Sequence, residues 1–378
     1  MIRVEGLVKT YRPHSGAASP PAVADISFTV KEGEFYTLLG PSGCGKTTTL
    51  RCLAGLERPD SGRVLLDGAE VAGGTVFVPA NRRDIGMVFQ SYAVWPHMSV
   101  FENVAFPLRE GRHRRRGRAL RDTVDKALDL VGLASFAQRG ATQLSGGQQQ
   151  RLALARAIVC EPAVLLLDAP LSNLDAKLRE RMRSEIRLLQ RRLGITTVFV
   201  THDQTEALSM SDRVAIMRDG RIIQEGSPRE IYFEAQNEFV ASFIGSMNLI
   251  YGDIRGRDEN GLICVETALG TVRCGTSLLE APRSSRAAIA IRLEDIILRL
   301  PGSGVSGGSA QNVFRGKIQV DMFGGTYTDY SVELAAGQIL RARVSSRVEL
   351  DQSGAIDIEI PPAACRLFDA EGLPWAQA

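Results

Sequence analysis

Short, unbroken apolar runs alternate with helix-like segments along the first part of the chain, up to about residue 235. Four runs have the character of strands in a sheet that is covered on both faces: Phe35–Leu39, Ala163–Leu167, Val198–Thr201 and Val214–Met217. Two segments, Thr47–Ala54 and Gln148–Val159, show helical spacing after glycine-rich starts. This alternation predicts an α/β domain.

The pattern changes after Pro228. Glu230–Ile244 has helical spacing. Short β-type runs, broken by glycines, follow it: Ile250–Arg255, Leu262–Val265, Thr271–Arg273, Ala287–Arg292, Val313–Val320, Tyr327–Leu334 and Gln338–Val344. So many short strands in roughly 130 residues predict a small barrel or sandwich.

The length of the chain fits this division. Its 378 residues exceed a usual single domain of roughly 100 to 200 residues. We therefore expect an α/β domain over residues 1–235, with a helical subdomain at about 90–160, followed by a small all-β domain over residues 236–378.

Composition narrows the class of protein. The net charge of +2 gives no argument for nucleic acid as a partner. No stretch approaches the roughly 20 apolar residues of a membrane span, and residues 1–13 lack the apolar core of a secretion signal. If the protein works at a membrane, we expect another chain to do the spanning. The six cysteines form no CxxC pair, which indicates reduced thiols in the cytoplasm.

One glycine-rich segment carries a specific chemistry. Residues 40–47 read GPSGCGKT, directly after FYTLL and directly before a helical segment, which is the Walker A pattern in its required context. Such a loop turns its amide N–H groups toward a phosphate, and the helix N-terminus adds partial positive charge. We expect Lys46 to reach the β- and γ-phosphates of ATP and Thr47 to offer its hydroxyl to Mg²⁺. The predicted nucleotide-binding positions are Ser42, Gly43, Cys44, Gly45, Lys46, Thr47 and Thr48.

An acidic residue completes the predicted phosphate site. The run AVLLLD over 163–168 is an apolar strand that ends in Asp168. A carboxylate at that place would hold Mg²⁺ beside the phosphates, often through water. Asp168 alone is weak evidence for a Mg²⁺ site, and it becomes specific only together with the phosphate-binding loop.

A second amide-rich turn lies between these two motifs, in QLSGGQQQR over 143–151. Here the sequence resembles the ABC ATPase family, whose signature is LSGGQ. A Gly-Gly helix start is a good anion-binding nest. The resemblance implies that this nest faces the γ-phosphate held by a second copy, so that a homodimer sandwiches two ATP molecules. The positions that would contact nucleotide across the interface are Ser145, Gly146, Gly147, Gln148 and Asp175.

Further motifs of the family follow in its order. Gln90, in MVFQSYAVWPHM, matches the Q-loop glutamine, which the family uses to sense Mg²⁺ and the γ-phosphate. Asp175 ends SNLD, which resembles the D-loop. His202, in VFVTHDQTEAL, resembles the switch histidine that contacts the γ-phosphate. Tyr11 sits where the family places an aromatic ring against adenine. The resemblance therefore implies catalytic roles for Gln90 and His202, and Mg²⁺ contacts for Thr47, Gln90 and Asp168.

One position departs from the family. A glutamate that polarises the attacking water normally follows the Walker B aspartate, and this chain has Ala169 there, in LLLDAPLSNLD. General-base assistance contributes about 10² to 10⁴ in rate. We therefore expect ATP to bind but to be hydrolysed very slowly, and the missing negative charge favours tighter binding of the triphosphate. Natural divergence and a deliberate substitution that traps the closed dimer both explain Ala169; the intact neighbouring motifs favour the second.

The C-terminal part is similar to the TOBE extension of importer ATPases in the maltose, polyamine, ferric-iron and phosphonate group. FVASFIGSMNLI over 239–250 matches its entry, and AIRLEDIIL over 290–298 resembles an internal segment in which Leu293 replaces the usual proline. The resemblance implies an ATPase subunit on the cytoplasmic face of the cell membrane. Its partners would be a second copy, two transmembrane permease subunits and, indirectly, a periplasmic solute-binding protein.

The residues that follow Gln90 suggest how a permease would be contacted. Tyr92, Val94, Trp95 and Met98 would form an exposed apolar surface beside the Q-loop, although they could equally belong to the core. Two other functions remain open: a soluble, non-transport ABC ATPase, and a non-hydrolysing regulator gated by ATP, which Ala169 favours. The sequence does not name the solute.

Overall fold

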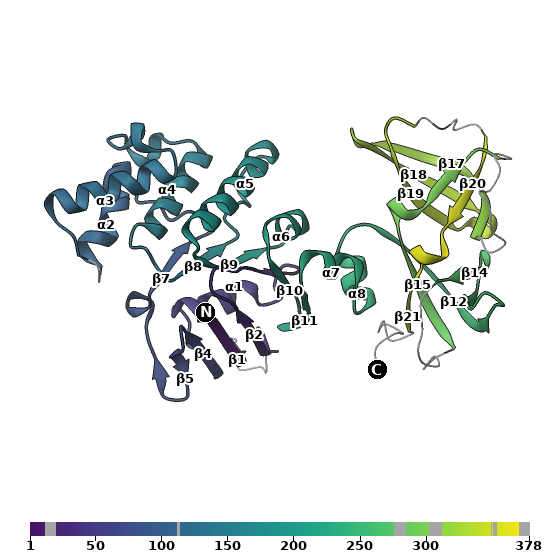
Figure 1. Cartoon of the computed structure of the whole chain (residues 1–378), viewed down its shortest axis with the longest axis horizontal. Helices are drawn as coiled ribbons and strands as arrows, with labels where there is room; N and C mark the ends of the chain where they lie inside the picture. Colours follow the sequence, from purple (N-terminus) through teal and green to yellow (C-terminus); the bar gives the residue numbers. More distant parts are fainter. Residues whose placement is uncertain are drawn as a thin grey trace. The chain divides into compact units, whose positions relative to one another are not determined.

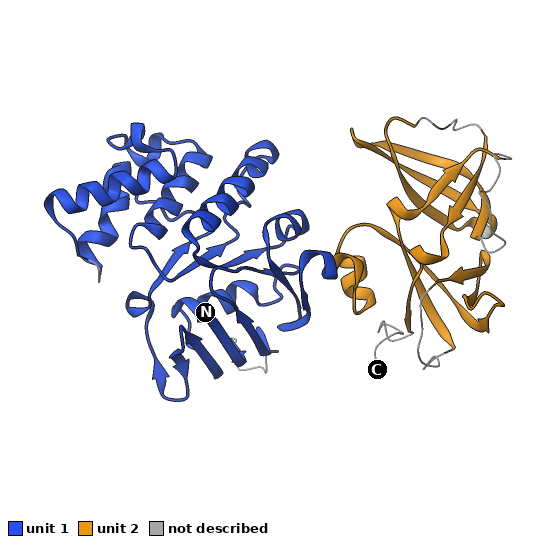
Figure 2. Ribbon diagram, viewed as in Figure 1, with its two compact units in different colours: residues 1–231 blue, residues 232–378 orange. Residues whose placement is uncertain are grey.

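The computed structural model describes residues 1–11, 20–111, 114–275, 285–301, 312–348, 350 and 354–369. The chain forms two compact units, Met1–Ile231 and Tyr232–Ala378, shown in separate colours in Figure 2. In the described residues no helix is both long enough and apolar enough to cross a membrane.

The first unit contains a six-stranded sheet in the order β11-β10-β3-β9-β8-β7. All neighbouring strands in it are parallel except the pair β10–β11. The strands are β3 (Phe35–Leu39), β7 (Ile85–Val88), β8 (Val164–Asp168), β9 (Thr196–Thr201), β10 (Arg213–Arg218) and β11 (Arg221–Gly226). Every residue of β3, β8 and β9 is buried, because both faces of the sheet are covered.

A five-stranded antiparallel sheet lies in the same unit, in the order β2-β1-β4-β5-β6. Its strands are β1 (Ile2–Lys9), β2 (Val23–Val30), β4 (Ser61–Leu66), β5 (Ala69–Gly73) and β6 (Val76–Phe77). The helices of the unit are α1 (Lys46–Ala54), α2 (Val100–Glu110), α3 (Gly117–Leu130), α4 (Gly146–Ile158), α5 (Ala176–Leu193) and α6 (Gln204–Met210) (Figure 1). A further helix, α7 (Pro228–Phe233), begins in this unit and ends two residues beyond it.

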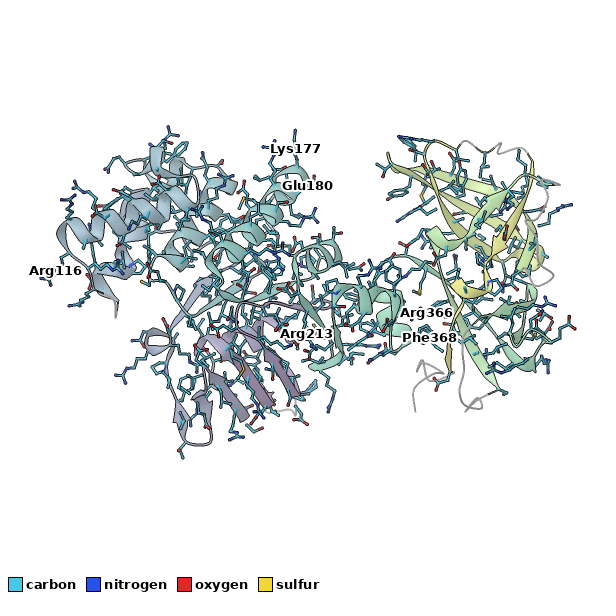
Figure 3. The ribbon with its side chains drawn as sticks, in the orientation of Figure 1. Arg116, Lys177, Glu180, Arg213, Arg366 and Phe368 are labelled. Atoms are coloured by element: carbon cyan, nitrogen blue, oxygen red, sulfur yellow. The ribbon has the colours of Figure 1, made fainter. Side chains whose placement is uncertain are left out.

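The six-stranded sheet separates two hydrophobic cores. Alternate residues of β8 point to opposite faces, as strand geometry requires. Leu165 and Leu167 join the core formed with α2, α3, α4 and α5. Val164 and Leu166 join the core formed with α1 and the antiparallel sheet. The amphipathic α5 keeps a charged outer face, on which Lys177 and Glu180 are exposed (Figure 3).

A buried arginine, Arg83, connects α1 to the neighbouring backbone segments through hydrogen bonds. Arg83 is 5% exposed, and its guanidinium group donates to four carbonyl oxygens. Two belong to the last turn of α1, Cys52 at 2.7 Å and Leu53 at 2.6 Å; the others are Val71 at 3.1 Å and Val78 at 2.8 Å. Burial lowers the pKa of Arg83 to about 10. The negative end of the α1 dipole favours a cation at this place.

After a short helix, α8 (Glu238–Phe243), the second unit is built from β-strands, as predicted. It contains two antiparallel five-stranded sheets, β14-β13-β12-β15-β21 and β16-β20-β17-β18-β19, which share one hydrophobic core. The strands are β12 (Met247–Arg257), β13 (Ile263–Thr267), β14 (Gly270–Cys274), β15 (Arg286–Arg292), β16 (Ile297–Arg299), β17 (Asn312–Phe323), β18 (Tyr327–Leu334), β19 (Ile339–Ser345), β20 (Ala355–Ile360) and β21 (Arg366–Asp369).

Two buried asparagines join these sheets. The Asn312 side chain accepts from the backbone N–H of Arg273 at 2.7 Å and donates to the carbonyls of Arg273 and Ile360 at 2.8 and 3.0 Å. The Asn248 side chain exchanges two 2.8 Å hydrogen bonds with the backbone of Arg341. Each asparagine thus replaces strand-to-strand hydrogen bonds where the sheets approach each other.

The single helix predicted over Glu230–Ile244 is wrong. The structure has α7 (Pro228–Phe233) and then a separate α8 (Glu238–Phe243). The break occurs because the Asn237 side chain accepts a hydrogen bond from the backbone N–H of Val240 at 2.8 Å and so caps a new helix. The apolar spacing continues through the break, which concealed it.

The buried arginine offers a test of the fold. Replacing Arg83 by Met should lower the free energy of unfolding of the first unit by about 3 kcal/mol, because four buried carbonyls lose a charged donor. Urea unfolding would measure this as a lower midpoint. Arg82→Met, at the exposed neighbouring position, is the matched control. Equal midpoints for the two variants would contradict the role given to Arg83.

Candidate nucleotide site

The candidate site forms where four parallel strands end side by side. In the register of the sheet, Leu39 of β3 pairs with Thr201 of β9, Val200 of β9 pairs with Asp168 of β8, and Val88 of β7 pairs with Leu167. The loops that follow these strands therefore leave from one edge. This edge is the usual ligand site of such sheets. It brings together the Walker A loop, Asp168 with Ala169, His202 and Gln90.

The Walker A loop is shaped by close backbone approaches. Gly45 has φ +100°, and a Cβ atom there would lie 2.1 Å from the carbonyl oxygen of Ala22. A Cβ at Gly40 would lie 2.2 Å from the carbonyl oxygen of Met217. Both positions therefore require glycine. The helix α1 begins at Lys46 with no side-chain cap and no acidic residue in its first turn, so its N-terminus is suited to an anion.

Lys46 and Thr47 point into this loop and toward Asp168. The Lys46 ammonium group, largely buried, donates to the carbonyls of Gly40 and Pro41 at 2.8 Å each. The Thr47 hydroxyl donates to the Asp168 carboxylate at 3.0 Å. Burial raises the pKa of Asp168, and the Thr47 hydrogen bond with the nearby cations Arg51 and Lys46 partly offsets that rise.

The other loop positions frame the same cradle. Ser42 and Gly43 are exposed at the turn, whereas Cys44 is buried in the core beneath it. Thr48 is half-buried in the first turn of α1. The Cys44 side chain therefore packs inward, and only its backbone is placed to face a ligand.

Gln90 contacts the segment that follows Asp168. Its side-chain nitrogen lies 3.4 Å from the Ser172 hydroxyl, and its carbonyl accepts from the Asn173 side chain at 3.1 Å. The Ser172 hydroxyl donates in turn to the carbonyl of Ala169 at 2.9 Å. Sequence reasoning missed Ser172 and Asn173; their signal was their place in SNLD directly before Asp175.

Ala169 adopts an unusual backbone conformation. Its φ is +42°, in the left-handed region, which costs a non-glycine residue about 1 to 2 kcal/mol. Its N–H donates to the carbonyl of Val200 at 3.0 Å, which holds the residue next to β9. Its side chain is a methyl group, so no proton acceptor is present at this position.

The exposed apolar surface predicted after Gln90 is wrong for Tyr92. The Tyr92 ring is 7% exposed and packs in the core with α2, α3 and α4. Val94, Trp95 and Met98 are half-buried. The Trp95 ring lies 4.5 Å from the Phe106 ring and is tilted against it. The physical reason is a left-handed turn at Tyr92, with φ +62°, which no spacing rule reveals.

The signature turn is held by a reciprocal helix cap. The Ser145 hydroxyl accepts from the N–H of Gln148 at 3.4 Å, and the Gln148 side chain accepts from the N–H of Ser145 at 2.9 Å. Gly147 packs against Leu178, since a Cβ there would lie 2.9 Å from that side chain. Gly146 is exposed, and a Cβ there would lie 3.8 Å from the Leu174 side chain, an ordinary van der Waals contact.

Asp175 and His202 lie on the two loops that follow β8 and β9. The Asp175 carboxylate caps α5 by accepting from the N–H of Leu178 at 3.0 Å. His202 is exposed directly after β9. Behind it, the Thr201 hydroxyl donates to the buried Glu206 carboxylate at 2.5 Å, and burial raises the pKa of Glu206.

Tyr11 lies far from these residues along the chain, two residues after the end of β1. Its ring is 44% exposed, and the Lys9 ammonium group lies 5.5 Å from the ring centroid. The ring is therefore available to stack on a planar ligand. Residues 12–19, which follow it, lie outside the described part of the chain.

The donor set fits Mg²⁺ with a triphosphate. Thr47 and Asp168 supply a hydroxyl and a carboxylate, the oxygen ligands that Mg²⁺ takes alongside phosphates. Within the described residues no group of three His, Cys, Asp or Glu side chains is placed to hold a metal by itself. A metal here would depend on phosphate and water for its remaining ligands.

Comparison with known proteins places this arrangement in a family. Residues 23–172 match the family model for the ABC transporter, and residues 289–368 match the model for the TOBE domain. The Fe(3+) ions import ATP-binding protein of Rhizobium meliloti (strain 1021) is 48% identical over 319 residues, which is 84% of this chain and 85% of that protein. The spermidine/putrescine import ATP-binding protein of Frankia alni is 45% identical over 347 residues, which is 89% of this chain and 71% of that protein.

Solved structures agree on the first unit. A dimeric ATP-binding cassette in a post-hydrolysis state, bound to ADP and Pi, has 33% sequence identity and a TM-score of 0.53, and the match covers 61% of this chain and 99% of that one. The chain belongs to the ABC transporter family, as an ATPase with a C-terminal TOBE domain related to the ferric-iron and polyamine import ATP-binding proteins.

Proposed function

We propose that this chain is the ATP-binding motor subunit of a bacterial ABC importer, which closes as a homodimer around two ATP molecules and hydrolyses them slowly. The observation that carries this proposal is the single sheet edge at which the Walker A loop, Asp168, His202 and Gln90 meet, with Ala169 beside Asp168. The relatives that import Fe(3+) ions or spermidine/putrescine support ferric iron or a polyamine as the solute.

We propose the partners from the resemblance to importer ATPases. Two transmembrane permease subunits would supply the pathway, a periplasmic binding protein would supply the solute, and this chain would lie on the cytoplasmic face of the membrane. The first unit, about residues 1–235, would bind nucleotide. The C-terminal unit, about residues 236–378, would mediate subunit contacts or regulation.

Each residue of the edge has a proposed task. The Walker A amides and Lys46 bind the β- and γ-phosphates, and Tyr11 stacks on the adenine. Thr47, Asp168 and Gln90 would hold Mg²⁺, which would supply positive charge beside the phosphates. The Ser145–Gly147 turn of the partner copy contacts the γ-phosphate, and the partner copy's Gln148 and Asp175 belong to the same contacting surface. His202 contacts the γ-phosphate from the copy whose Walker A loop binds it.

A second candidate rests on Ala169 alone. A chain that binds ATP and dimerises without hydrolysis would act as a regulator gated by ATP. The rate of hydrolysis with and without a restored carboxylate separates the two functions.

Restoring that carboxylate is the first test. Ala169→Glu should raise phosphate release by about 10² to 10⁴, because a general base then faces the attacking water. The left-handed backbone already carries a Cβ atom, so glutamate adds no new backbone strain. Ala169→Gln, of the same size but without a proton acceptor, should stay slow. Equal rates for the original chain and the glutamate variant would refute slow hydrolysis through Ala169.

The signature turn gives a test of the dimer. Ser145→Asp keeps a good helix cap but brings a negative charge to the proposed γ-phosphate contact. Half-maximal dimerisation should then need at least about tenfold more Mg-ATP, as measured by light scattering. Ser145→Asn is the neutral cap control and should dimerise like the original chain. If both variants dimerise at the same ATP concentration, the turn does not face nucleotide.

The raised pKa of Asp168 gives a test of the metal site. A carboxyl group whose pKa is raised in the folded state favours its protonated form there, so its free energy of unfolding falls as the pH rises past the ordinary value of 3.8 and through the raised pKa. Asp168→Asn should therefore unfold at the same or a higher temperature than the original chain at pH 7 without nucleotide.

The same variant should lose the stabilisation that Mg-ATP gives to the original chain, because an amide is a poor Mg²⁺ ligand. Thermal unfolding with ATP and EDTA is the control, in which ATP should raise the unfolding temperature of the two proteins by the same amount. A variant that is still stabilised by Mg²⁺ would exclude Asp168 as a metal contact.

A further inference from the structure

We propose that Arg156, on the signature helix α4, is a positioning residue that fixes the loop after Gln90 and so ties Gln90 to the signature turn. The inference rests on the proposed role of Gln90 in holding Mg²⁺, and it adds a residue that the motifs do not include. Arg156 lies about three helical turns along α4 from Ser145.

The loop after Gln90 is strained. Tyr92 and Ala93 are consecutive non-glycine residues with φ of +62° and +46°. Each such residue costs about 1 to 2 kcal/mol and persists only where its surroundings hold it. The Tyr92 hydroxyl does not hold it, because that buried oxygen has no hydrogen-bond partner among the described residues.

The Arg156 guanidinium group hydrogen-bonds to both residues of this turn. One of its terminal nitrogens donates to the Ala93 carbonyl at 2.6 Å, and the other donates to the Tyr92 carbonyl at 2.9 Å. Two successive left-handed residues turn their carbonyls to the same side, where one planar fork can reach both. Lysine, a point charge with a single nitrogen, cannot reproduce that geometry.

Aromatic packing keeps the guanidinium group in place. It lies 4.5 Å from the Trp95 ring centroid, over the ring that also packs on Phe106. The Trp95 backbone is held by Asn103 of α2, which is fully buried: its side chain accepts from the Trp95 N–H at 3.0 Å and donates to the Trp95 carbonyl at 3.2 Å. The loop is thus anchored to α2 and to α4.

The other end of the loop is Gln90, which contacts Ser172 and Asn173 beyond Asp168. A continuous set of contacts therefore runs from α4, through Arg156 and the Tyr92–Ala93 turn, to Gln90 and the proposed metal site. A shift of α4 relative to the sheet would change the place of Gln90 through the Arg156 fork.

The test uses the full chain with Trp375→Phe, so that Trp95 is the one remaining tryptophan of two. Arg156→Lys keeps the charge and removes the fork. Arg151→Lys is the matched control, because Arg151 lies on the same helix but pairs with Glu185 of α5. We expect only Arg156→Lys to change the Trp95 emission, and to raise the Mg²⁺ concentration for half-maximal ATP-driven dimerisation by about tenfold.

ATP binding in EDTA should change by less than about twofold in both variants, because neither touches the Walker A loop. Equal Mg²⁺ dependence for Arg156→Lys and Arg151→Lys would overturn the inference. A Gln90→Ala variant that leaves the Mg²⁺ dependence unchanged would instead overturn the proposed role of Gln90, so the two failures are distinguishable.

A rescue separates positioning from simple support of α4. Glycine adopts positive φ without cost, so Ala93→Gly should let the turn form with less help. Added to Arg156→Lys, it should return the Mg²⁺ concentration for half-maximal dimerisation most of the way to its original value and restore the original Trp95 emission. If Arg156 only stabilised its helix, Ala93→Gly would restore neither, and this result would overturn the inference even where Arg156→Lys folds poorly.

Discussion

The parallel register of β3, β9, β8 and β7 is the constraint on which the site depends. Side chains from residues 40 to 202 meet only because these strands end at one edge. Burial of β3, β8 and β9 on both faces makes a shift in register expensive, since it would expose or misplace whole rows of apolar side chains. The hydrophobic cores therefore fix the geometry of the polar edge.

Much of the α/β fold and of the candidate site could be predicted from the sequence, because the polar residues of the site directly follow apolar strand segments. Runs such as FYTLL and AVLLLD mark buried strands, and a polar residue directly after a run must lie at the edge. The antiparallel strands β1 and β4 escaped prediction, since their mixed patterns, such as that of Ser61–Leu66, leave many positions half-exposed. Strand β2 was also missed, although its buried and exposed positions alternate regularly. The cap at Asn237 was missed because a single side chain outweighed continuous apolar spacing.

The site shows a similar limit. Sequence motifs predicted Gln90, Asp168 and His202. The hydrogen bonds that connect their loops, however, are accepted by backbone carbonyls, which every residue has, so no residue type marks them in the sequence. Tyr92 was expected at the surface as an aromatic residue beside a sensor, and a left-handed turn instead directs it into the core. Positive φ at non-glycine residues depends on tertiary contacts and not on local propensity.

The reciprocal cap at Ser145 and Gln148 has a consequence for assembly. The side chain of each residue already accepts a hydrogen bond from the backbone N–H of the other, and Gly147 already packs on Leu178. The turn is therefore ordered in each isolated subunit, and its conformational entropy is lost during folding and not during association. In the proposed homodimer, two such turns would meet as preformed surfaces, so their association would not require this turn to rearrange.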